Sequence, residues 1–351
     1  MPKVTGEKLE KIAFHLFGAA GAPEEHSRIV AKHLADNNLT GHDSHGFIRV
    51  IQYLQQIKDG LLFPAAIPEI VRESPATAQI DGHRGFGQVV AKFSTELAIK
   101  KAKEQGVSSV TMRYLGHLGR LGAYGEMAAK EGCVAILFCA TGGLALSQAP
   151  FGGSKRKLGT NPIALTFPAE KEGAISSDFA TSVAAEGKVR VYRARGQKLP
   201  DGWILDQEGR PSNDPNDFYA GGAILPIGSS VGYKGFCLAF MTDIFGSLLS
   251  RDGFPAKPGK QFSNGSLIVV IDIERFAPLA AAKSEASQMV EFIKDTPLAQ
   301  GFEEVLYPGE KEAKNRKERT KTGVDIENET WSQVMALVKA YGVDEQIGKV
   351  L

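Results

Sequence analysis

The segment NLTGHDSHGFIRVIQY, residues 38–53, places a polar turn with two histidines ahead of an apolar run that has helical spacing. If a helix begins near Ser44, the side chains of His45, Arg49 and Tyr53 are four residues apart and lie on one helix face. The segment therefore predicts a helix that brings an imidazole, a guanidinium and a phenol to one patch.

Helical signals continue around this segment, over residues 5–65. Thr5 is a suitable N-cap for a first helix, and Pro23 is suited to the first turn of a second helix. Apolar residues in the run 47–57 recur at helical spacing and indicate a third helix. We therefore expect residues 1–70 to form a helical domain.

Beyond residue 68 the pattern changes to short β-branched runs separated by glycine-rich turns. The expected strands are 76–80, 107–112, 134–138, 163–167, 175–179 and 267–273. The expected helices are 89–103, 121–130, 236–250, 277–293 and 330–341. Because one helix follows a strand and another precedes one, some parallel pairing is expected. The order predicts a mixed α/β domain over residues 71–274, with residues 275–351 returning to the helical domain.

Two segments differ from this pattern. Residues 195–228 are rich in glycine, proline, aspartate and asparagine, which indicates a long excursion built of turns, suited to an active-site flap or a dimer arm. The run 311–321 is densely charged and is interpreted as the solvated face of a helix.

The composition excludes several classes of partner. Forty-one basic and 40 acidic residues leave a formal net charge of +1, so no global field favours nucleic acid or an anionic membrane. The three cysteines lie in apolar runs, which predicts buried thiols in a reducing compartment and not a disulfide framework. The N-terminus lacks the apolar stretch of a secretion signal, and no segment approaches the ~20 apolar residues of a membrane span. We expect a soluble, cytoplasmic protein.

The predicted patch suits the chemistry of a 2-oxo acid. A guanidinium at Arg49 can bind a carboxylate bidentately, while the imidazole of His45 can give a proton to a carbonyl oxygen as hydride reaches the carbon. The phenol of Tyr53 can add a further hydrogen bond. A helix N-terminus lowers the pKa of an imidazole, so His45 needs an acidic partner. Asp178, at the end of an apolar run, is the best candidate, with Ser44 as a relay.

Two other interpretations of this patch stay open. His45 can be a helix-terminus histidine, Arg49 a surface arginine and Tyr53 a half-buried core residue. Alternatively His42, Asp43 and His45 can be metal ligands, although no thiolate pair and no His-Glu-x-x-His run accompanies them. We expect no metal.

The sequence contains no complete Gly-x-Gly-x-x-Gly fingerprint for a dinucleotide. The nearest match, GFGQVV over residues 85–90, has Val90 in place of the third glycine and is interpreted as a turn with a tight helix start. The stretch GHLGRLG, residues 116–122, combines backbone amides, an arginine and a helix N-terminus, which predicts an anion cradle. The alternative is a glycine-rich turn with an incidental histidine.

In five ordered blocks, the sequence resembles the type 2 malate/L-lactate dehydrogenase family over most of its length. The blocks are GHDSHG (41–46) with Arg49 and Tyr53, HLGRLGAY (117–124), FGG (151–153) running to LGTNP (158–162), DFATS (178–182) with Gly187 and Lys188, and GYKG (232–235) with PGE (308–310). Many members have an arginine directly after the last block, where this sequence has Lys311 and the nearest substitute is Arg316.

The resemblance implies a non-Rossmann fold, with a helical domain from both chain ends and a cofactor domain on a largely antiparallel sheet. It implies a homodimer whose active sites lie between domains, close to the partner subunit. It also implies that His45 is the proton donor, supported by Ser44 and Asp178, and that His117 either binds substrate or accepts a proton. The cofactor contacts it implies are His117, Gly119, Arg120, Leu121, Thr160, Asn161, Asp178, Ala180, Thr181, Lys234, Gly235, Pro308, Gly309 and Glu310.

The expected function is interconversion of a 2-oxo acid and a 2-hydroxy acid with NAD or NADP. NADH is the favoured cofactor. Arg49, Tyr53 and His117 are the expected substrate contacts. The segment 81–88 is most similar to the broad hydroxycarboxylate dehydrogenase branch of the family. The alternatives are a reductase of cyclic imino acids, which the family also resembles, and a non-catalytic dinucleotide-binding protein.

Overall fold

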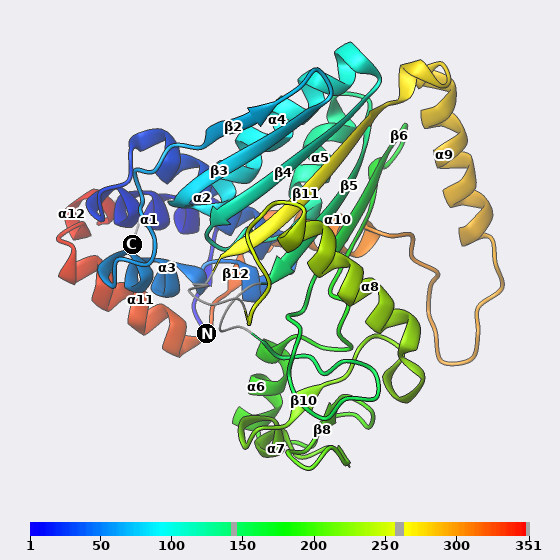
Figure 1. Ribbon diagram of the computed structural model, residues 1–351. Coiled ribbons are helices and arrows are strands. Elements are labelled where there is room, and N and C mark those ends of the chain that lie inside the picture. The colour runs from blue at the N-terminus through cyan, green and yellow to red at the C-terminus, as the bar shows by residue number, and fades with distance from the viewer. Residues whose placement is uncertain (142–145, 257–262, 349–351) are drawn as a thin grey trace.

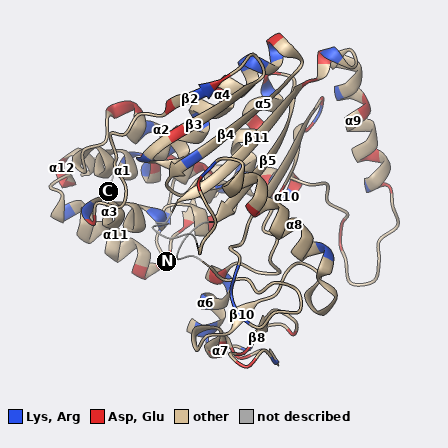
Figure 2. Ribbon diagram, viewed as in Figure 1, with Lys and Arg blue, Asp and Glu red and all other residues tan. Residues whose placement is uncertain are grey.

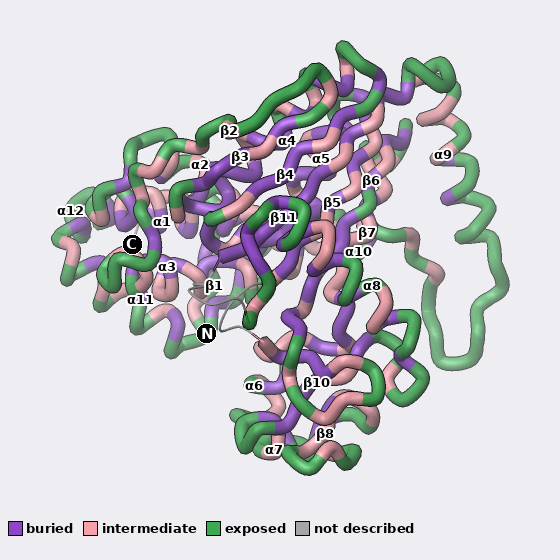
Figure 3. The backbone as a smooth tube through the Cα atoms, viewed as in Figure 1, coloured by how far each residue is buried: buried purple, intermediate pink, exposed green. Residues whose placement is uncertain are grey.

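The computed structural model describes residues 1–141, 146–256 and 263–348. A twisted sheet runs through the middle of the molecule, with a cluster of helices at one end and a small lobe below it (Figure 1). The strands at the centre of the sheet are largely buried, whereas α9 and the segment after it are mostly exposed (Figure 3). Basic and acidic residues are interspersed over the elements in the view of Figure 2.

The helical cluster contains residues from both ends of the chain. Its elements are α1 (Gly6–Ala19), α2 (Glu24–Leu39), η1 (Asp43–His45), α3 (Arg49–Lys58), α11 (Asn328–Ala340), α12 (Asp344–Ile347), and the paired strands β1 (Lys3–Val4) and β12 (Val324–Asp325). The Thr5 hydroxyl accepts a hydrogen bond from the Lys8 amide at the start of α1, as its N-cap position predicts. Apolar residues such as Leu16, Phe17 and Val334 are fully buried in one shared core, which holds the two chain ends together.

The main sheet has the strand order β2-β3-β4-β11-β5-β6-β7. Its strands are β2 (Glu69–Glu73), β3 (Thr77–Gly85), β4 (Val107–Leu115), β5 (Cys133–Thr141), β6 (Ile163–Ala169), β7 (Gly173–Phe179) and β11 (Asn264–Asp272). Only β3 and β4 pair in parallel, across the intervening helix α4, and every other neighbouring pair is antiparallel. This confirms the expected largely antiparallel sheet, although the edge strand β2 was not predicted.

Helices cover both faces of the sheet. On one face, α4 (Gly87–Gln105) packs on β3, β4 and β11, and α5 (Gly122–Lys130) packs on β5, β6 and β7. On the other, α8 (Tyr233–Asp243) and the π-helical segment η3 (Ile244–Leu248) contact β5 and β11. Cys133 and Cys139 are buried free thiols, as predicted, and Cys237 is a half-buried one.

The segment predicted as an excursion of turns contributes to a small folded lobe. The lobe contains α6 (Glu186–Ala194), β8 (Ile204–Leu205), β9 (Pro211–Ser212), α7 (Pro215–Tyr219) and β10 (Ala223–Ile224), followed by η2 (Ser229–Val231). The three strands pair in the order β10-β8-β9. The buried side chains of Val189, Phe218 and Ile224 pack in a separate core within the lobe. Regular structure therefore forms in a segment whose composition predicts only turns.

Two helices in the last third of the chain, α9 and α10, pack in different places. After η4 (Ile273–Arg275), α9 (Leu279–Lys294) lies along the sheet and contacts β6 (Figure 1). By contrast, α10 (Glu310–Thr322) contacts α2 of the helical cluster. The charged run on α10 is not only a solvated face, because the guanidinium of Arg316 binds the Asp36 carboxylate and that of Arg319 binds the Asp43 carboxylate. The division of the chain at residues 70 and 275 stays a prediction. No helix in the described ranges combines the length and the apolar character of a membrane span.

We predict that Gly87→Ala lowers the free energy of unfolding by about 1–3 kcal/mol, because an added Cβ would stand 2.4 Å from the carbonyl oxygens of both Gly116 and His117. The matched control is Gly18→Ala in α1, where the nearest atom, Ser27 Oγ, is 3.8 Å away. The control should leave stability unchanged or raise it by about 0.5–1 kcal/mol. Chemical denaturation of both variants measures the difference, and equal stabilities would contradict the packing described.

Candidate active site

The turn η1 carries Ser44 and His45, and α3 begins only at Arg49. The predicted helix start near Ser44 was therefore wrong by about one turn. The physical reason lies in two buried amides at the end of α2. Asn37 donates from Nδ2 to the His45 carbonyl at 2.9 Å, and Asn38 Oδ1 accepts from the Phe47 amide at 2.7 Å. These bonds hold the backbone in a turn where helix spacing alone predicts a continuous helix.

Despite this change, the predicted polar side chains do come together. The Tyr53 hydroxyl lies 2.7 Å from His117 Nδ1, and the rings of His117 and His45 are 5.1 Å apart between centroids. The Ser44 hydroxyl is 2.9 Å from His45 Nδ1, and Arg49 donates from Nε to the Ser44 carbonyl at 2.6 Å. The cluster therefore joins η1 and α3 to the loop after β4.

Both imidazoles in the cluster are neutral at neutral pH. Loss of water on burial, followed by the nearby charge of Arg49, lowers the pKa of His45 to about 3. The same two causes hold the pKa of His117 well below its ordinary value. Burial raises the pKa of Tyr53 to about 12, so the phenol keeps its hydrogen. The cluster therefore contains one cation and neutral donors, which suits an anionic ligand.

Asp178 lies at the end of β7, and its carboxylate accepts a hydrogen bond from the Gly122 amide at the start of α5, at 2.7 Å. Burial raises the pKa of this carboxyl, while the Gly122 bond opposes the shift. Within the described residues, no hydrogen bond joins Asp178 to His45 or Ser44. The supporting role expected for Asp178 therefore stays a prediction.

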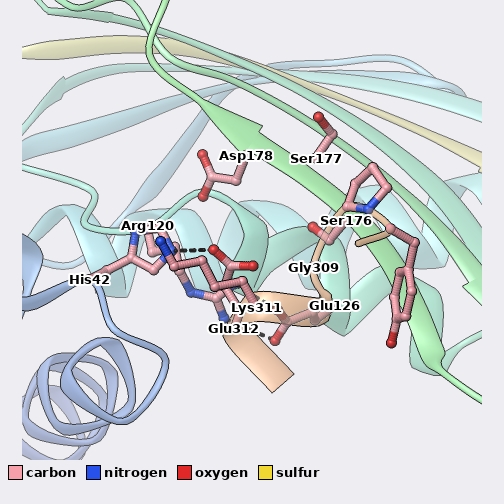
Figure 4. Close-up of a pocket in the computed structure, with 11 residues that line it drawn as sticks. His42, Arg120, Glu126, Ser176, Ser177, Asp178, Gly309, Lys311 and Glu312 are labelled. Carbon is pink, nitrogen blue, oxygen red and sulfur yellow. Dashed lines mark hydrogen bonds and ion pairs between the residues drawn. The ribbon is translucent and has the colours of Figure 1, made fainter. Parts of the chain in front are cut away.

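A cavity of about 270 Å³ lies next to Asp178. It is lined by His42, Arg120, Glu126, Ser176, Ser177, Asp178, Tyr307, Pro308, Gly309, Lys311 and Glu312. Figure 4 shows Asp178 on the strand side of the cavity, with His42, Lys311 and Glu312 on the opposite side. Arg120 binds Glu126 through both terminal nitrogens, yet its buried Nε has no partner among the described residues. Arg316, the proposed substitute for the arginine that many members have after PGE, does not line the cavity, whereas Lys311 does.

The donors and acceptors of this cavity fit a dinucleotide. Lys311, Arg120 and the N-terminus of α10 offer positive charge for phosphate oxygens, and the Asp178 carboxylate can accept hydrogen bonds from ribose hydroxyls. Gly309 has a φ of +97°, which favours glycine at the turn into α10, and the preceding Pro308 carbonyl accepts from the Ser176 amide at 3.0 Å. The strand β7 and the start of α10 are thereby held side by side.

The other predicted cofactor residues lie outside the lining of this cavity. They are His117 after β4, Gly119 and Leu121 before α5, Thr160 and Asn161 before β6, Ala180 and Thr181 after β7, Lys234 and Gly235 in α8, and Glu310 in α10. The Asn161 amide donates to the Ala239 carbonyl and to Asp243, and its oxygen accepts from the Thr141 amide. Its side chain is therefore engaged within the protein, and a cofactor contact there stays a prediction.

Several residues of the site were not singled out from the sequence. Glu126, Ser176, Ser177 and Glu312 carry no motif that could have marked them, and Gln88 lies in the GFGQVV stretch, which was interpreted only as a turn with a tight helix start. Glu126 lies on the predicted helix 121–130, but its partner Arg120 precedes that helix and is six residues away, outside the three- or four-residue spacing at which opposite charges pair on one helix face.

His42 and Asp43, considered as metal ligands with His45, have other partners. His42 lies 3.2 Å from Glu312, and Asp43 accepts hydrogen bonds from Asn38 and Arg319. In the part of the chain that the structure describes, no group of three histidine, cysteine or acidic residues could hold a metal ion.

We predict that the free energy of unfolding falls on acidification at pH values well above those at which carboxylates titrate. His33, His45 and His117 all have a lowered pKa, so between about pH 6.5 and pH 5 the unfolded chain binds more protons than the folded one. Stability should therefore fall as the pH is lowered through this window. The raised pKa of Asp178 favours the folded chain as the pH falls, but this single carboxyl opposes the three imidazoles.

Urea unfolding at about pH 7.5, 6.5 and 5.5 measures this dependence. A free energy of unfolding that stays constant or rises toward pH 5.5 would show that these imidazoles are protonated in the folded chain.

Known proteins share both the sequence and the fold of this chain. The family model described as malate/L-lactate dehydrogenase matches residues 4–335. A malate dehydrogenase of Pyrococcus horikoshii is 37% identical over 350 residues, which cover 97% of this chain and 96% of that protein. An L-sulfolactate dehydrogenase of Methanocaldococcus jannaschii is 36% identical over 343 residues, 96% of this chain and 97% of that protein.

Among solved structures, a malate dehydrogenase from Entamoeba histolytica superposes with a TM-score of 0.92 at 29% identity, covering 97% of this chain and 98% of that one. A delta1-piperideine-2-carboxylate reductase from Pseudomonas syringae superposes with a TM-score of 0.84 at 26% identity, covering 96% of this chain and 100% of that one.

Proposed function

We propose, starting from the fact that this chain belongs to the malate/L-lactate dehydrogenase family, that it interconverts a 2-oxo acid and its 2-hydroxy acid with NAD or NADP. The observation that carries the proposal is the cluster of Arg49, His45, Tyr53 and His117, in which one half-buried cation lies beside neutral imidazoles. Relatives named as malate and sulfolactate dehydrogenases support the class of substrate.

Each side chain of the cluster has a proposed task in reduction. Arg49 binds the carboxylate of the oxo acid and so fixes its orientation. His45 gives a proton to the carbonyl oxygen, through Nε2, because its Nδ1 is bonded to Ser44. The bound carboxylate brings a negative charge next to Arg49, and it raises the pKa of His45 toward the working pH. The nicotinamide cofactor supplies the hydride when bound.

The cofactor would lie along the cavity beside Asp178. Arg120, Lys311 and the turn Pro308–Gly309 are the proposed contacts that the lining of the cavity supports. The contacts at Thr160, Asn161, Thr181, Lys234 and Gly235 rest on the family motifs alone. NADH is proposed ahead of NADPH.

We also propose a cytoplasmic homodimer. Large apolar side chains are exposed in and around α8, including Val231 at 81%, Tyr233 at 59%, Phe240 at 50% and Leu249 at 53%. An apolar surface of this kind is costly in water, and a second copy of the chain would cover it.

A reductase of cyclic imino acids is the second candidate, supported by the structural neighbour of that activity. Following NADH and NADPH absorbance with a panel of 2-oxo acids and a cyclic imino acid separates the two. The proposed function requires that at least one 2-oxo acid supports oxidation of NADH or NADPH. Its kcat/KM should be higher than that of the imino acid. Cofactor binding without turnover of any substrate would instead favour a non-catalytic dinucleotide-binding protein.

For Arg49→Lys we predict a fall in kcat/KM for the best 2-oxo acid of at least about tenfold, because an ammonium cannot bind a carboxylate through two parallel hydrogen bonds. The matched control is Arg72→Lys on the exposed strand β2, which should keep normal activity. Steady-state kinetics of both variants gives the comparison. Unaltered kcat/KM in Arg49→Lys would remove the proposed carboxylate clamp.

His45→Ala should reduce turnover by about 10²-fold or more, as expected for the loss of a general acid. Single-turnover reduction of the oxo acid measures this step. If turnover stays near normal, the proton donor is not His45, and His117 becomes the candidate because its ring lies beside that of His45.

A further inference from the structure

A chain of three side chains leads from the start of α4 to His117. Gln88 donates from Nε2 to the Tyr53 hydroxyl at 2.8 Å, and that hydroxyl lies 2.7 Å from His117 Nδ1. Gln88 and Tyr53 are each 1% exposed, so no bulk water competes for these bonds. The absence of a side chain at Gly87 lets the start of α4 touch the backbone of His117, which holds the chain together.

The direction of these bonds fixes the position of one hydrogen. A phenol has a single hydrogen, and its oxygen already accepts the hydrogen bond from Gln88. Among the described residues, His117 Nδ1 is the acceptor within hydrogen-bond distance of the phenol hydrogen, so Tyr53 donates to His117 Nδ1. Because burial and the charge of Arg49 keep the His117 ring neutral, the ring has one N–H, and that hydrogen lies on Nε2.

The opposite direction would require the Gln88 amide to be turned around. Its oxygen would then accept from Tyr53, and its amino group would be buried with two N–H bonds and no acceptor. In the present orientation the unpartnered atom is the oxygen, Gln88 Oε1. A buried N–H without a partner is rarer in proteins than an unsatisfied carbonyl oxygen, so the present orientation is favoured.

We propose that Gln88, acting through Tyr53, fixes His117 in the tautomer that has its hydrogen on Nε2, so that His117 donates a hydrogen bond to an oxygen of the bound acid and does not accept a proton from it. The part of this inference that concerns the acid rests on the proposed function. Gln88 is a positioning residue, and it is hydrogen-bonded to Tyr53 and not to His117.

This tautomer also bears on the class of substrate. The carbonyl oxygen of an oxo acid accepts a hydrogen bond from an N–H donor. The nitrogen of a protonated cyclic imine carries its own hydrogen and needs an acceptor. A donor at Nε2 therefore favours oxo acids over imino acids, whereas the other tautomer would favour imino acids.

The direct test is the tautomer of His117 in the wild-type protein. Histidine labelled with ¹⁵N and long-range proton–nitrogen correlation spectra distinguish the two tautomers, and the signals of His117 are assigned by their loss in His117→Gln. The expected result is a hydrogen on Nε2 above about pH 7. A hydrogen on Nδ1 would overturn the proposal, whatever the activity of the protein.

The reversal test is Gln88→Glu, which replaces a donor by a group that only accepts. Tyr53 should then donate to the carboxylate and accept from His117, which moves the hydrogen to Nδ1. We expect kcat/KM for 2-oxo acids to fall by about tenfold or more, and its pH profile to gain an ionisation as the carboxylate raises the pKa of His117. The control for added charge is Gln288→Glu on an exposed face of α9. It should change neither kcat/KM nor its pH profile.

The two readouts separate this inference from the proposed function. A hydrogen on Nε2 in a protein that turns over no oxo acid would leave the proposed tautomer standing and reject the function. An unchanged tautomer and pH profile in Gln88→Glu would reject the inference and leave the function standing. If Gln88→Glu does not fold, the wild-type spectrum decides the question alone.

Discussion

A half-buried guanidinium, whose hydrogen-bond partners among the described residues are neutral, organises this site. Arg49 donates to the Ser44 carbonyl and to the Gln52 side-chain oxygen, and among the described residues it forms no ion pair with a carboxylate. Removing a charge from water without pairing it is costly, so the site gains when an anion binds. The same positive charge helps to keep His45 and His117 neutral until that anion arrives. Under the proposed function, binding of an anion at Arg49 and protonation of His45 are thereby linked.

The rest of the fold keeps the turn before α3 in position. Asn37 and Asn38 hold it from α2, and helix α10 holds it from the distant C-terminal part of the chain, through Glu312 at His42 and Arg319 at Asp43. The first turn of α10 also lines the cavity beside Asp178. One helix therefore contacts both the turn that carries His45 and the proposed cofactor cavity.

Local signals in the sequence were enough to predict most helices and strands. Thr5 at a helix start and the β-branched runs of the central strands are examples, and the ordered motifs predicted the family and its antiparallel sheet. The sequence did not reveal the turn at Ser44, because its geometry depends on amides that are buried by tertiary packing. Gln88 was not recognised for the same reason, since its partner Tyr53 is 35 residues away in the chain.

The central claim is that His45 is neutral in the free site and gains a proton only when an anion binds near Arg49. Potentiometric titration in weak buffer near pH 7, with NADH present and oxamate as a non-reducible analogue of a 2-oxo acid, measures this directly. The account predicts net proton uptake approaching about one per site, which is lost in His45→Ala. Oxamate binding with no proton uptake, or with proton release, would contradict it.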